Sequence, residues 1–190
     1  YDTKALIKLL GKQGAELQAH ANGIDQSPVT PHTSGEMKSI GRSTTLSQDV
    51  TDIEDVRNIF LDMCEEVGFD ARKHNKKART IQITIKYSDF QTITRQVGTE
   101  PTNLTRDIFE IGFSLLRKNW NSFRPVRLIG VSISGFDKEM MYQQLSLFDG
   151  DENLGQSAKE EKLERAIDNI RLKHGLGSVT RAVQIKKTGI

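Results

Sequence analysis

Features of membrane and secreted proteins are absent from this sequence. No apolar run approaches the length that spans a bilayer, and no secretory leader is recognised. A single cysteine, Cys64, excludes an internal disulfide framework and suits a reducing cytoplasm. The four histidines show no metal-ligand spacing. We therefore expect a cytoplasmic protein with no membrane partner and no metal site, in which Cys64 is a buried structural thiol.

Charge of one sign is not in large excess, but it is unevenly distributed. The net charge is +2, with 27% charged and 36% hydrophobic residues, a balance typical of a globular chain with some flexible polar sequence. Its 190 residues suffice for one ordinary domain with appendages or for two small domains. The strongest local excess, named here the basic cluster, consists of Arg72, Lys73, Lys76, Lys77 and Arg79. It indicates a polyanionic partner, and a solvated basic turn is the alternative.

Residues 1–22 carry apolar positions at helical spacing and are predicted to form two short helices, broken at Gly11-Lys12-Gln13-Gly14. A glycine-containing turn can aim free backbone N–H groups at a phosphate, although a plain helical hairpin shows the same pattern. Residues 23–37, rich in Gly, Pro, Ser and Thr, are predicted to be a linker and hence a domain boundary. Because the chain begins at Tyr1 rather than Met, we expect a fragment or a processed product.

Residues 38–136 alternate between strand-like and helix-like patterns and predict one α+β domain. Ile81, Ile83 and Ile85 alternate with polar residues, as in a strand with one buried face. The expected elements are strands at 39–47, 79–87, 90–97 and 126–133, a helix from a Thr51–Glu54 capping box to Gly68, and a helix capped by Asn103. The order β-α-β-β-α-β is the split βαβ pattern, a four-stranded sheet with both helices on one face.

The sheet face away from those helices is predicted to be polar and open. Its members are small hydroxyl and amide side chains, one lysine and a glycine: Thr80, Gln82, Thr84, Lys86, Thr92, Thr94, Gln96, Gly130, Ser132 and Ser134, flanked by Arg42, Arg95 and Arg127. Such a surface offers hydrogen bonds to phosphate oxygens without reading bases. An RNA-recognition module has the same strand order but requires stacking aromatics on its central strands, and none stands there. An ordinary polar face of a small α+β domain is the alternative.

Residues 137–156 are predicted to be a flexible tail that carries a peptide for another protein. The segment Gln144-Leu145-Ser146-Leu147-Phe148 places large apolar side chains in a polar run with no evident burial site within the chain. Leu147 and Phe148 could insert into a partner's pocket while Gln144 is anchored by hydrogen bonds. Packing of this segment back on the domain is the alternative.

Residues 157–190 are predicted to contain one amphipathic helix. A capping box at Ser157–Glu160 opens it, and His174-Gly175 ends it. The apolar residues on one side of this helix are Leu163, Ala166, Ile167 and Ile170. The helix could pack on the domain or on a partner, or fold only in part.

Several of these segments resemble the Y-family translesion DNA polymerases of bacteria. The run from Lys38 to Arg42 resembles the opening of the family's little-finger domain, and the run from Arg127 to Ser132 resembles its last strand. Residues 9–21 are similar to the end of the family's thumb domain. The segment 144–148 resembles the pentapeptide that binds the bacterial sliding clamp, and residues 163–182 resemble the family's C-terminal extension. The resemblance thus covers nearly the whole chain.

The resemblance implies a role for each matching residue. Template-strand phosphates would lie against Ser39, Ile40, Gly41 and Arg42, with Lys38 as a further DNA contact, and the duplex would face Thr94, Arg95 and Arg127. A thumb turn made of Gly11, Lys12 and Gly14 would grip the primer side. Gln144, Leu145, Leu147 and Phe148 would anchor the sliding clamp. Leu128 stands where some members have a second arginine, and this departure from the family's pattern weakens the contact expected at that position.

The resemblance also implies what lies elsewhere in the family's proteins. Their metal-binding carboxylates and two Mg²⁺ ions belong to a palm domain, and no such set is recognised here, so this chain is expected to be inactive alone. Its expected partners are duplex primer–template DNA and the bacterial sliding clamp. Two rival hypotheses are a stand-alone nucleic-acid-binding module and an adaptor that binds only the clamp.

Overall fold

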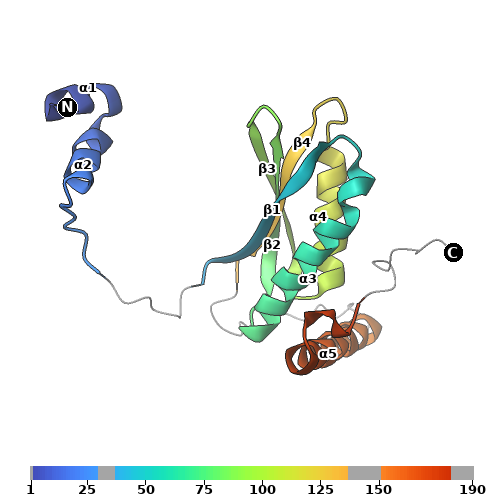
Figure 1. The fold of residues 1–190 in the computed structure, drawn as a ribbon. Coiled ribbons are helices and arrows are strands. Elements are labelled where there is room, and N and C mark those ends of the chain that lie inside the picture. The colour runs from blue at the N-terminus through green and yellow to red at the C-terminus, as the bar shows by residue number, and fades with distance from the viewer. Residues whose placement is uncertain (1, 30–36, 137–150, 181–190) are drawn as a thin grey trace. The chain divides into compact units, whose positions relative to one another are not determined.

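A computed structural model describes residues 2–29, 37–136 and 151–180 (Figure 1). These residues fall into two compact units, the first within residues 1–36 and the second within residues 37–190. Along the described ranges, no helix is both long enough and apolar enough to cross a membrane. The same ranges contain no group of three or more His, Cys, Asp or Glu side chains placed to hold a metal ion.

The first unit consists of two short helices, α1 (Thr3–Leu10) and α2 (Lys12–Ala21). Asp2 caps α1, since its side chain accepts a hydrogen bond from the backbone N–H of Lys4. The break is confirmed, but it is one residue wide: Gly11, with φ 63°, is the only residue between the helices. Gly14 lies inside α2, where a Cβ atom would stand 2.4 Å from the carbonyl oxygen of Leu6. Gly14 therefore permits the two helices to touch.

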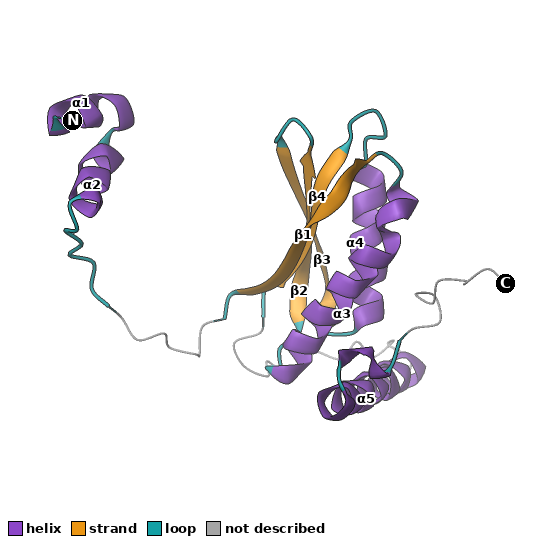
Figure 2. Ribbon diagram, viewed as in Figure 1, coloured by secondary structure: helices purple, strands orange, loops and turns teal. Residues whose placement is uncertain are grey.

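The second unit contains a four-stranded sheet and two helices that cover one of its faces (Figure 2). The strands are β1 (Ser39–Val50), β2 (Ala78–Tyr87), β3 (Thr92–Thr102) and β4 (Val126–Ser134), in the order β1-β4-β2-β3. All neighbouring strands are antiparallel. The helices are α3 (Arg57–Lys73), preceded by the 3-10 turn η1 (Ile53–Val56), and α4 (Thr105–Asn119). The predicted α+β class and the β-α-β-β-α-β order are confirmed.

The core lies between the sheet and the two helices. Ile81, Ile83 and Ile85 of β2 are fully buried, and they pack in one cluster with Phe60 of α3 and Leu116 of α4. Cys64 belongs to the same cluster, and burial raises the pKa of its thiol far above the usual range. The interpretation of Cys64 as a structural thiol is therefore confirmed.

Three predicted helix boundaries are wrong. Gly68 does not end α3, because it provides room for the side chains of Arg72 and Thr105, each 3.0 Å from where its Cβ would be. Asp52, rather than Thr51, caps the first turn through the N–H of Glu54. Asn103 does not cap α4, whose N-cap position is occupied by Leu104.

The C-terminal helix is α5 (Asp151–His174), followed by the 3-10 turn η2 (Leu176–Ser178). Its end at His174 agrees with the prediction, and Gly175 follows with φ 94°. Its start does not agree, because the helix begins six residues before Ser157. Ser157 is therefore an interior residue of α5 and not its cap.

Candidate nucleic-acid interface

The face of the sheet opposite α3 and α4, named here the open face, consists of four rows of side chains. Residues paired directly across antiparallel strands point to the same side of a sheet. Each row crosses the sheet with one residue from each strand, in the order β1, β4, β2 and β3. The four rows are Ser39, Ser134, Thr80 and Gly98; Gly41, Ser132, Gln82 and Gln96; Ser43, Gly130, Thr84 and Thr94; and Thr45, Leu128, Lys86 and Thr92. Lys86 is the only charged residue among these sixteen positions, which otherwise carry small or polar side chains and one leucine. The predicted polar, open face is therefore present, and Thr94 lies on it.

Two glycines allow β1 and β4 to approach closely in the middle of the open face. A Cβ on Gly41 would lie 2.8 Å from the Cβ of Ser132, and a Cβ on Gly130 would lie 3.0 Å from the Cβ of Ser43. A larger residue at either glycine would push against the neighbouring strand. The two glycines therefore keep this part of the open face free of large side chains, next to the hydroxyl groups of Ser43 and Ser132.

Two of the three flanking arginines lie on the other side of the sheet. Arg42 pairs with Val131 in the register, and Arg95 pairs with Ile83, so both share the side of buried core residues. The Arg42 guanidinium binds Glu66, with Nε 2.8 Å from the carboxylate, and also Asp70. The hydrogen bond to Glu66 and the charge of Asp70 raise the pKa of Arg42 above its ordinary value. Arg42 and Arg95 therefore do not point from the open face, in contrast to the sequence interpretation.

Arg127, the third flanking arginine, lies at the end of the open face beside an exposed aromatic ring. The pairing shifts between Lys86 and Tyr87, so that Arg127 is the extra residue of a bulge in β4. Its guanidinium carbon is 5.1 Å from the ring centroid of Phe90, and the Lys86 ammonium is 5.0 Å from the same centroid. Phe90 is 62% exposed. We name Lys86, Phe90 and Arg127 the hairpin-end cluster.

The β2–β3 turn and the loop that precedes β4 are tied together beside this cluster. The backbone N–H of Ser88 donates to the carbonyl of Pro125 at 2.9 Å. The guanidinium carbon of Arg124 lies 4.0 Å from the ring centroid of Tyr87, and the same guanidinium pairs with Asp89. The hydrogen bond from the backbone N–H of Gln91 lowers the pKa of Asp89 against an opposing desolvation, and Arg124 lowers it further. The turn that presents Phe90 is therefore fixed at both sides.

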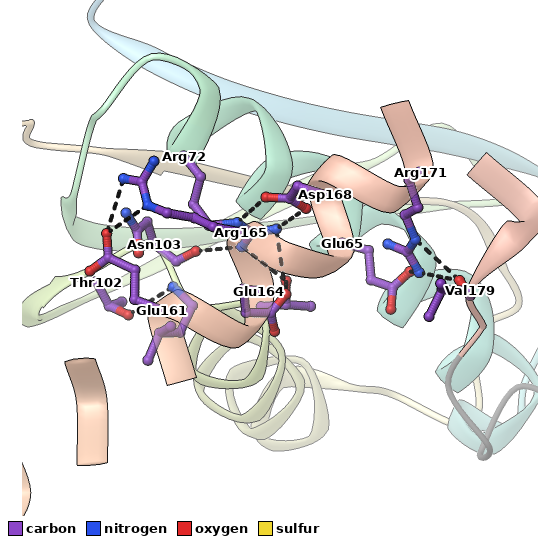
Figure 3. A network of polar contacts seen from close by, with 12 residues as sticks. Glu65, Arg72, Thr102, Asn103, Glu161, Glu164, Arg165, Asp168, Arg171 and Val179 are labelled. Carbon is purple, nitrogen blue, oxygen red and sulfur yellow. Dashed lines mark hydrogen bonds and ion pairs between the residues drawn. The ribbon is translucent and has the colours of Figure 1, made fainter. Parts of the chain in front are cut away.

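Arg72, part of the basic cluster, is buried in a network of polar contacts with α5 (Figure 3). Its side chain is 2% exposed and binds Asp168 of α5 through two nitrogens, at 2.6 and 2.9 Å. The same guanidinium donates to the carbonyl of Asn103 at 2.8 Å and lies 3.5 Å from Glu164. While α5 is docked, Arg72 has no surface that could reach a phosphate. The sequence interpretation of Arg72 as a DNA contact does not fit this arrangement.

Further ion pairs join α5 to the same end of the domain. Lys77 lies 2.8 Å from Glu161, Arg106 binds Glu160, and Arg171 lies 2.9 Å from Glu65. Partial burial opposes the charged form of Glu161, but hydrogen bonds from Lys77 and Arg165 outweigh it and lower the pKa of this carboxyl. Of the basic cluster, Lys73, Lys77 and Arg79 are exposed and Lys76 is partly exposed. Lys77 nonetheless has a carboxylate partner.

The polar side of α5 faces the domain, and its apolar side faces away. The docked residues Glu160, Glu161, Glu164, Asp168 and Arg171 recur at helical spacing. On the other side, Leu163 is 61% exposed and Ile170 is 43% exposed. Of the three possibilities left open by the sequence, α5 thus packs on its own domain, through its charged residues.

The remaining predicted contacts divide between the two units and the undescribed tail. Lys38 and Ser39 are exposed at the start of β1, whereas Ile40 is 6% exposed, with its side chain in the core. Gly11 and Lys12 stand at the start of α2, which has no side-chain cap to satisfy its first amide groups. The clamp-binding residues Gln144, Leu145, Leu147 and Phe148 lie outside the described residues.

Sequence reasoning missed two features of this surface. The acidic residues of α5 were not matched with the basic cluster, because Arg72 and Asp168 are 96 positions apart and no local pattern connects them. Residues 90–97 were predicted to form a strand, and neither the turn position of Phe90 nor its two cationic neighbours were foreseen. No signal in the sequence indicated this turn position, because Phe90 has φ 65°, a conformation in which Gly or Asn is usual.

Comparison with known proteins gives matches over nearly the whole chain. Residues 37–147 match the family model described as the impB/mucB/samB family C-terminal domain. DNA polymerase IV of Clostridium kluyveri is 47% identical over 191 residues, which cover 99% of this chain and 48% of that protein. DNA polymerase IV of Alkaliphilus oremlandii is 45% identical over 95% of this chain and 46% of that protein. The chain therefore spans about half the length of the curated relatives that it matches.

Solved structures also align with part of this chain. One is a complex of the beta-clamp processivity factor and the little finger domain of PolIV; it aligns with a TM-score of 0.46 and 20% identity over 58% of this chain and 98% of that chain. Another is a chimera of the Y-family DNA polymerases Dbh and Dpo4, with a TM-score of 0.46 and 20% identity over 71% of this chain and 38% of that chain.

Proposed function

Since this chain belongs to the impB/mucB/samB family C-terminal domain and is a relative of bacterial DNA polymerase IV, we propose that it holds duplex DNA and tethers a translesion polymerase to the sliding clamp. The observation that carries the first part is the open face. Its sixteen positions contain no acid and a single lysine, and most of the others are hydroxyl or amide side chains or glycine. Such groups donate hydrogen bonds to phosphate oxygens without distinguishing one base from another.

The proposed mechanism follows from what the open face offers a duplex. Ser39, Gly41 and Thr94 would lie against backbone phosphates, with Lys38 and Arg127 supplying positive charge at the ends of the face. Because no side chain at these positions would read a base edge in a groove, a damaged base would not change the contacts. In the first unit, Gly11, Lys12 and Gly14 would grip the primer side through the start of α2.

An isosteric substitution tests the open face. Gln82→Glu adds one negative charge at the centre of this face without changing the size of the side chain. We expect it to lower the affinity for blunt duplex DNA several-fold at low salt, measured by fluorescence anisotropy. The matched control is Asn58→Asp, the same change in charge at an exposed position of α3. Equal losses in the two variants would reject the open face as the binding surface.

The second part of the proposal concerns the tail. We assign clamp binding to Gln144, Leu145, Leu147 and Phe148, on the pentapeptide pattern of residues 144–148. Burial of two large apolar side chains in a pocket contributes roughly 1.5–3 kcal/mol each, less the cost of ordering the peptide, so the tether should be weak and exchangeable. Such a tether would raise the effective concentration of the polymerase at the primer end.

Titration with a bacterial sliding clamp tests the tail. A peptide with the sequence of residues 144–148 should compete with the 190-residue chain for the clamp, and Leu147→Ala with Phe148→Ala should abolish binding. A competitor peptide that carries the same two alanines is the control. Binding that persists in the double variant would reject the assignment and leave the DNA-holding proposal untouched.

Nucleotide transfer itself is assigned to sequence outside this chain. Y-family polymerases use two Mg²⁺ ions to stabilise the attacking and leaving oxygens. We expect the 190-residue chain to incorporate no nucleotide in a primer-extension assay with Mg²⁺. Extension that depends on this chain and is retained after removal of all contaminating polymerase would overturn that assignment.

A further inference from the structure

We propose that Phe90 is a stacking platform for one unpaired base of single-stranded DNA at the end of the open face. The inference rests on the proposed function, since it assumes that DNA lies on that face. Three observations carry it: the exposure of the ring, the conformation of its backbone and the two cations beside it.

The backbone of Phe90 is in a conformation that a large side chain seldom adopts. Phe90 has φ 65°, within a turn in which its N–H donates to the carbonyl of Tyr87 at 3.0 Å. The next residue closes the hairpin, since the N–H of Tyr87 donates to the carbonyl of Gln91 at 2.9 Å. Gly is the usual residue at such a turn position. Strain of this kind at an exposed position indicates a role beyond folding.

The ring of Phe90 is exposed rather than used for packing. It is 62% exposed, while the neighbouring Tyr87 is 3% exposed and belongs to the core. An exposed aromatic ring beside a polar surface is the element that single-strand-binding proteins use, because every base has a flat face that can stack. The core would keep its packing without this ring.

The charges around Phe90 complement a nucleotide. Lys86 and Arg127 lie 5.0 and 5.1 Å from the ring centroid. Cation–π contact at an exposed site contributes roughly a two- to fivefold factor in affinity, whereas base–aromatic stacking contributes roughly five- to 150-fold per base. A base can therefore displace one cation from the ring, and that cation can then pair with the phosphate next to the stacked base. The hairpin-end cluster would thus hold a base and its phosphate together.

The experiment compares two DNA substrates with the full 190-residue chain. One is a blunt duplex, and the other is the same duplex with a 5′ single-stranded template extension. We expect the extended substrate to bind at least about fivefold more tightly. An abasic residue at each extension position keeps the phosphates and removes the bases, so it should abolish this preference.

Phe90→Gly removes the ring and suits the turn. Because Gly accepts a positive φ without strain, the variant should unfold at the same or a higher temperature than the original chain. It should retain the affinity for blunt duplex and lose the preference for the extension. The matched control is Phe123→Ala, which removes a ring that is 94% exposed on the loop before β4. This control should keep the preference.

Each outcome decides between the proposals. An unchanged preference in Phe90→Gly, or an equal loss in Phe123→Ala, overturns the stacking platform. The platform is also overturned if the abasic extension binds as well as the normal one, because phosphate attraction then explains the preference. Blunt-duplex binding without any preference would leave the DNA-holding function standing and reject the platform. Absence of binding to both substrates would reject both.

Discussion

Two ends of the second unit carry clusters of positive charge, which acidic side chains pair and partly cover at one end and which border an exposed ring at the other. At one end, Arg72 is 2% exposed and held by Asp168, and Lys77 pairs with Glu161. At the other end, Arg127 and Lys86 border the exposed ring of Phe90. Figure 1 shows α5 beside the first end and the β2–β3 turn at the second.

This difference shows that basic residues in a sequence do not all provide positive charge that a ligand can reach. The basic cluster is the strongest local excess in the chain, yet acidic side chains of α5 neutralise part of it. The hairpin end has fewer basic residues within a short stretch, because its cations come from different strands. A cation that already has a carboxylate partner gives up that pairing before it can pair with a phosphate. The weaker sequence signal therefore marks the better candidate for binding DNA.

The largest expected effect is on the free energy of unfolding, and it tests how strongly the contacts of Arg72 hold the first end together. Arg72→Ala removes the pair with Asp168 and the hydrogen bonds to Asn103 and Thr105. We expect a loss of about 3–5 kcal/mol in the free energy of unfolding, measured with urea. Arg127→Ala is the control and should change the free energy by less than about 0.5 kcal/mol. Similar values for the two variants would show that the first end is no more tightly held than the second.

A second prediction concerns a variant that exposes the covered cations of the first end, so that this end resembles the hairpin end. Asp168→Asn removes the main partner of Arg72, so we expect α5 to detach and its amide hydrogens to exchange faster. The uncovered Arg72 and Lys77 should then raise the affinity for duplex DNA roughly threefold at low salt. Asp49→Asn, at an exposed position of β1, has the same change in net charge and should leave both quantities unchanged. Faster exchange without tighter DNA binding would show that the covered cations are not placed to reach DNA.

A third prediction measures how many phosphates each end contacts. Removal of one phosphate contact lowers the slope of log affinity against log salt by about 1. Arg127→Gln should show this decrease for duplex DNA, whereas Lys77→Gln should leave the slope nearly unchanged. A lower slope for Lys77→Gln together with an unchanged slope for Arg127→Gln would assign the DNA interface to the basic cluster.

The smallest effect concerns pH. Because the pKa of Glu161 is lowered on folding, its pairing with Lys77 stabilises docked α5 at pH values above the ordinary pKa of 4.5. That stabilisation should be lost as the pH falls through the lowered pKa, and limited proteolysis should then cut α5 more readily. Lys77→Gln should move this onset to higher pH. An onset that does not move would mean that other groups control the docking.

The fold could be predicted from the sequence because its signals are local. The alternation of Ile81, Ile83 and Ile85 and the helical spacing around Phe60 establish the strand and helix order. Helix ends were harder to place, since Gly68 is used for close packing against Arg72 and not as a terminus. A glycine can serve either purpose, and only the neighbours in space decide.

The candidate site could be predicted only in part. Strand alternation gave the polar residues of the open face, including Thr94 and Ser132. Arg42 is two positions from the buried Ile40, so strand alternation already places it on the core side. The position of Arg127 depends on a bulge and did not follow from counting positions. The cover over Arg72 needed a helix 96 residues away.

The wholly buried Cys64 makes this chain convenient for spectroscopy. Its raised pKa keeps the thiol protonated at neutral pH, and the surrounding core blocks access by reagents. Because the sequence contains no other cysteine, a dye can be attached selectively at a cysteine introduced on the surface. A dye pair placed on α5 and on the β2–β3 turn would then report the detachment of the helix by energy transfer, one molecule at a time.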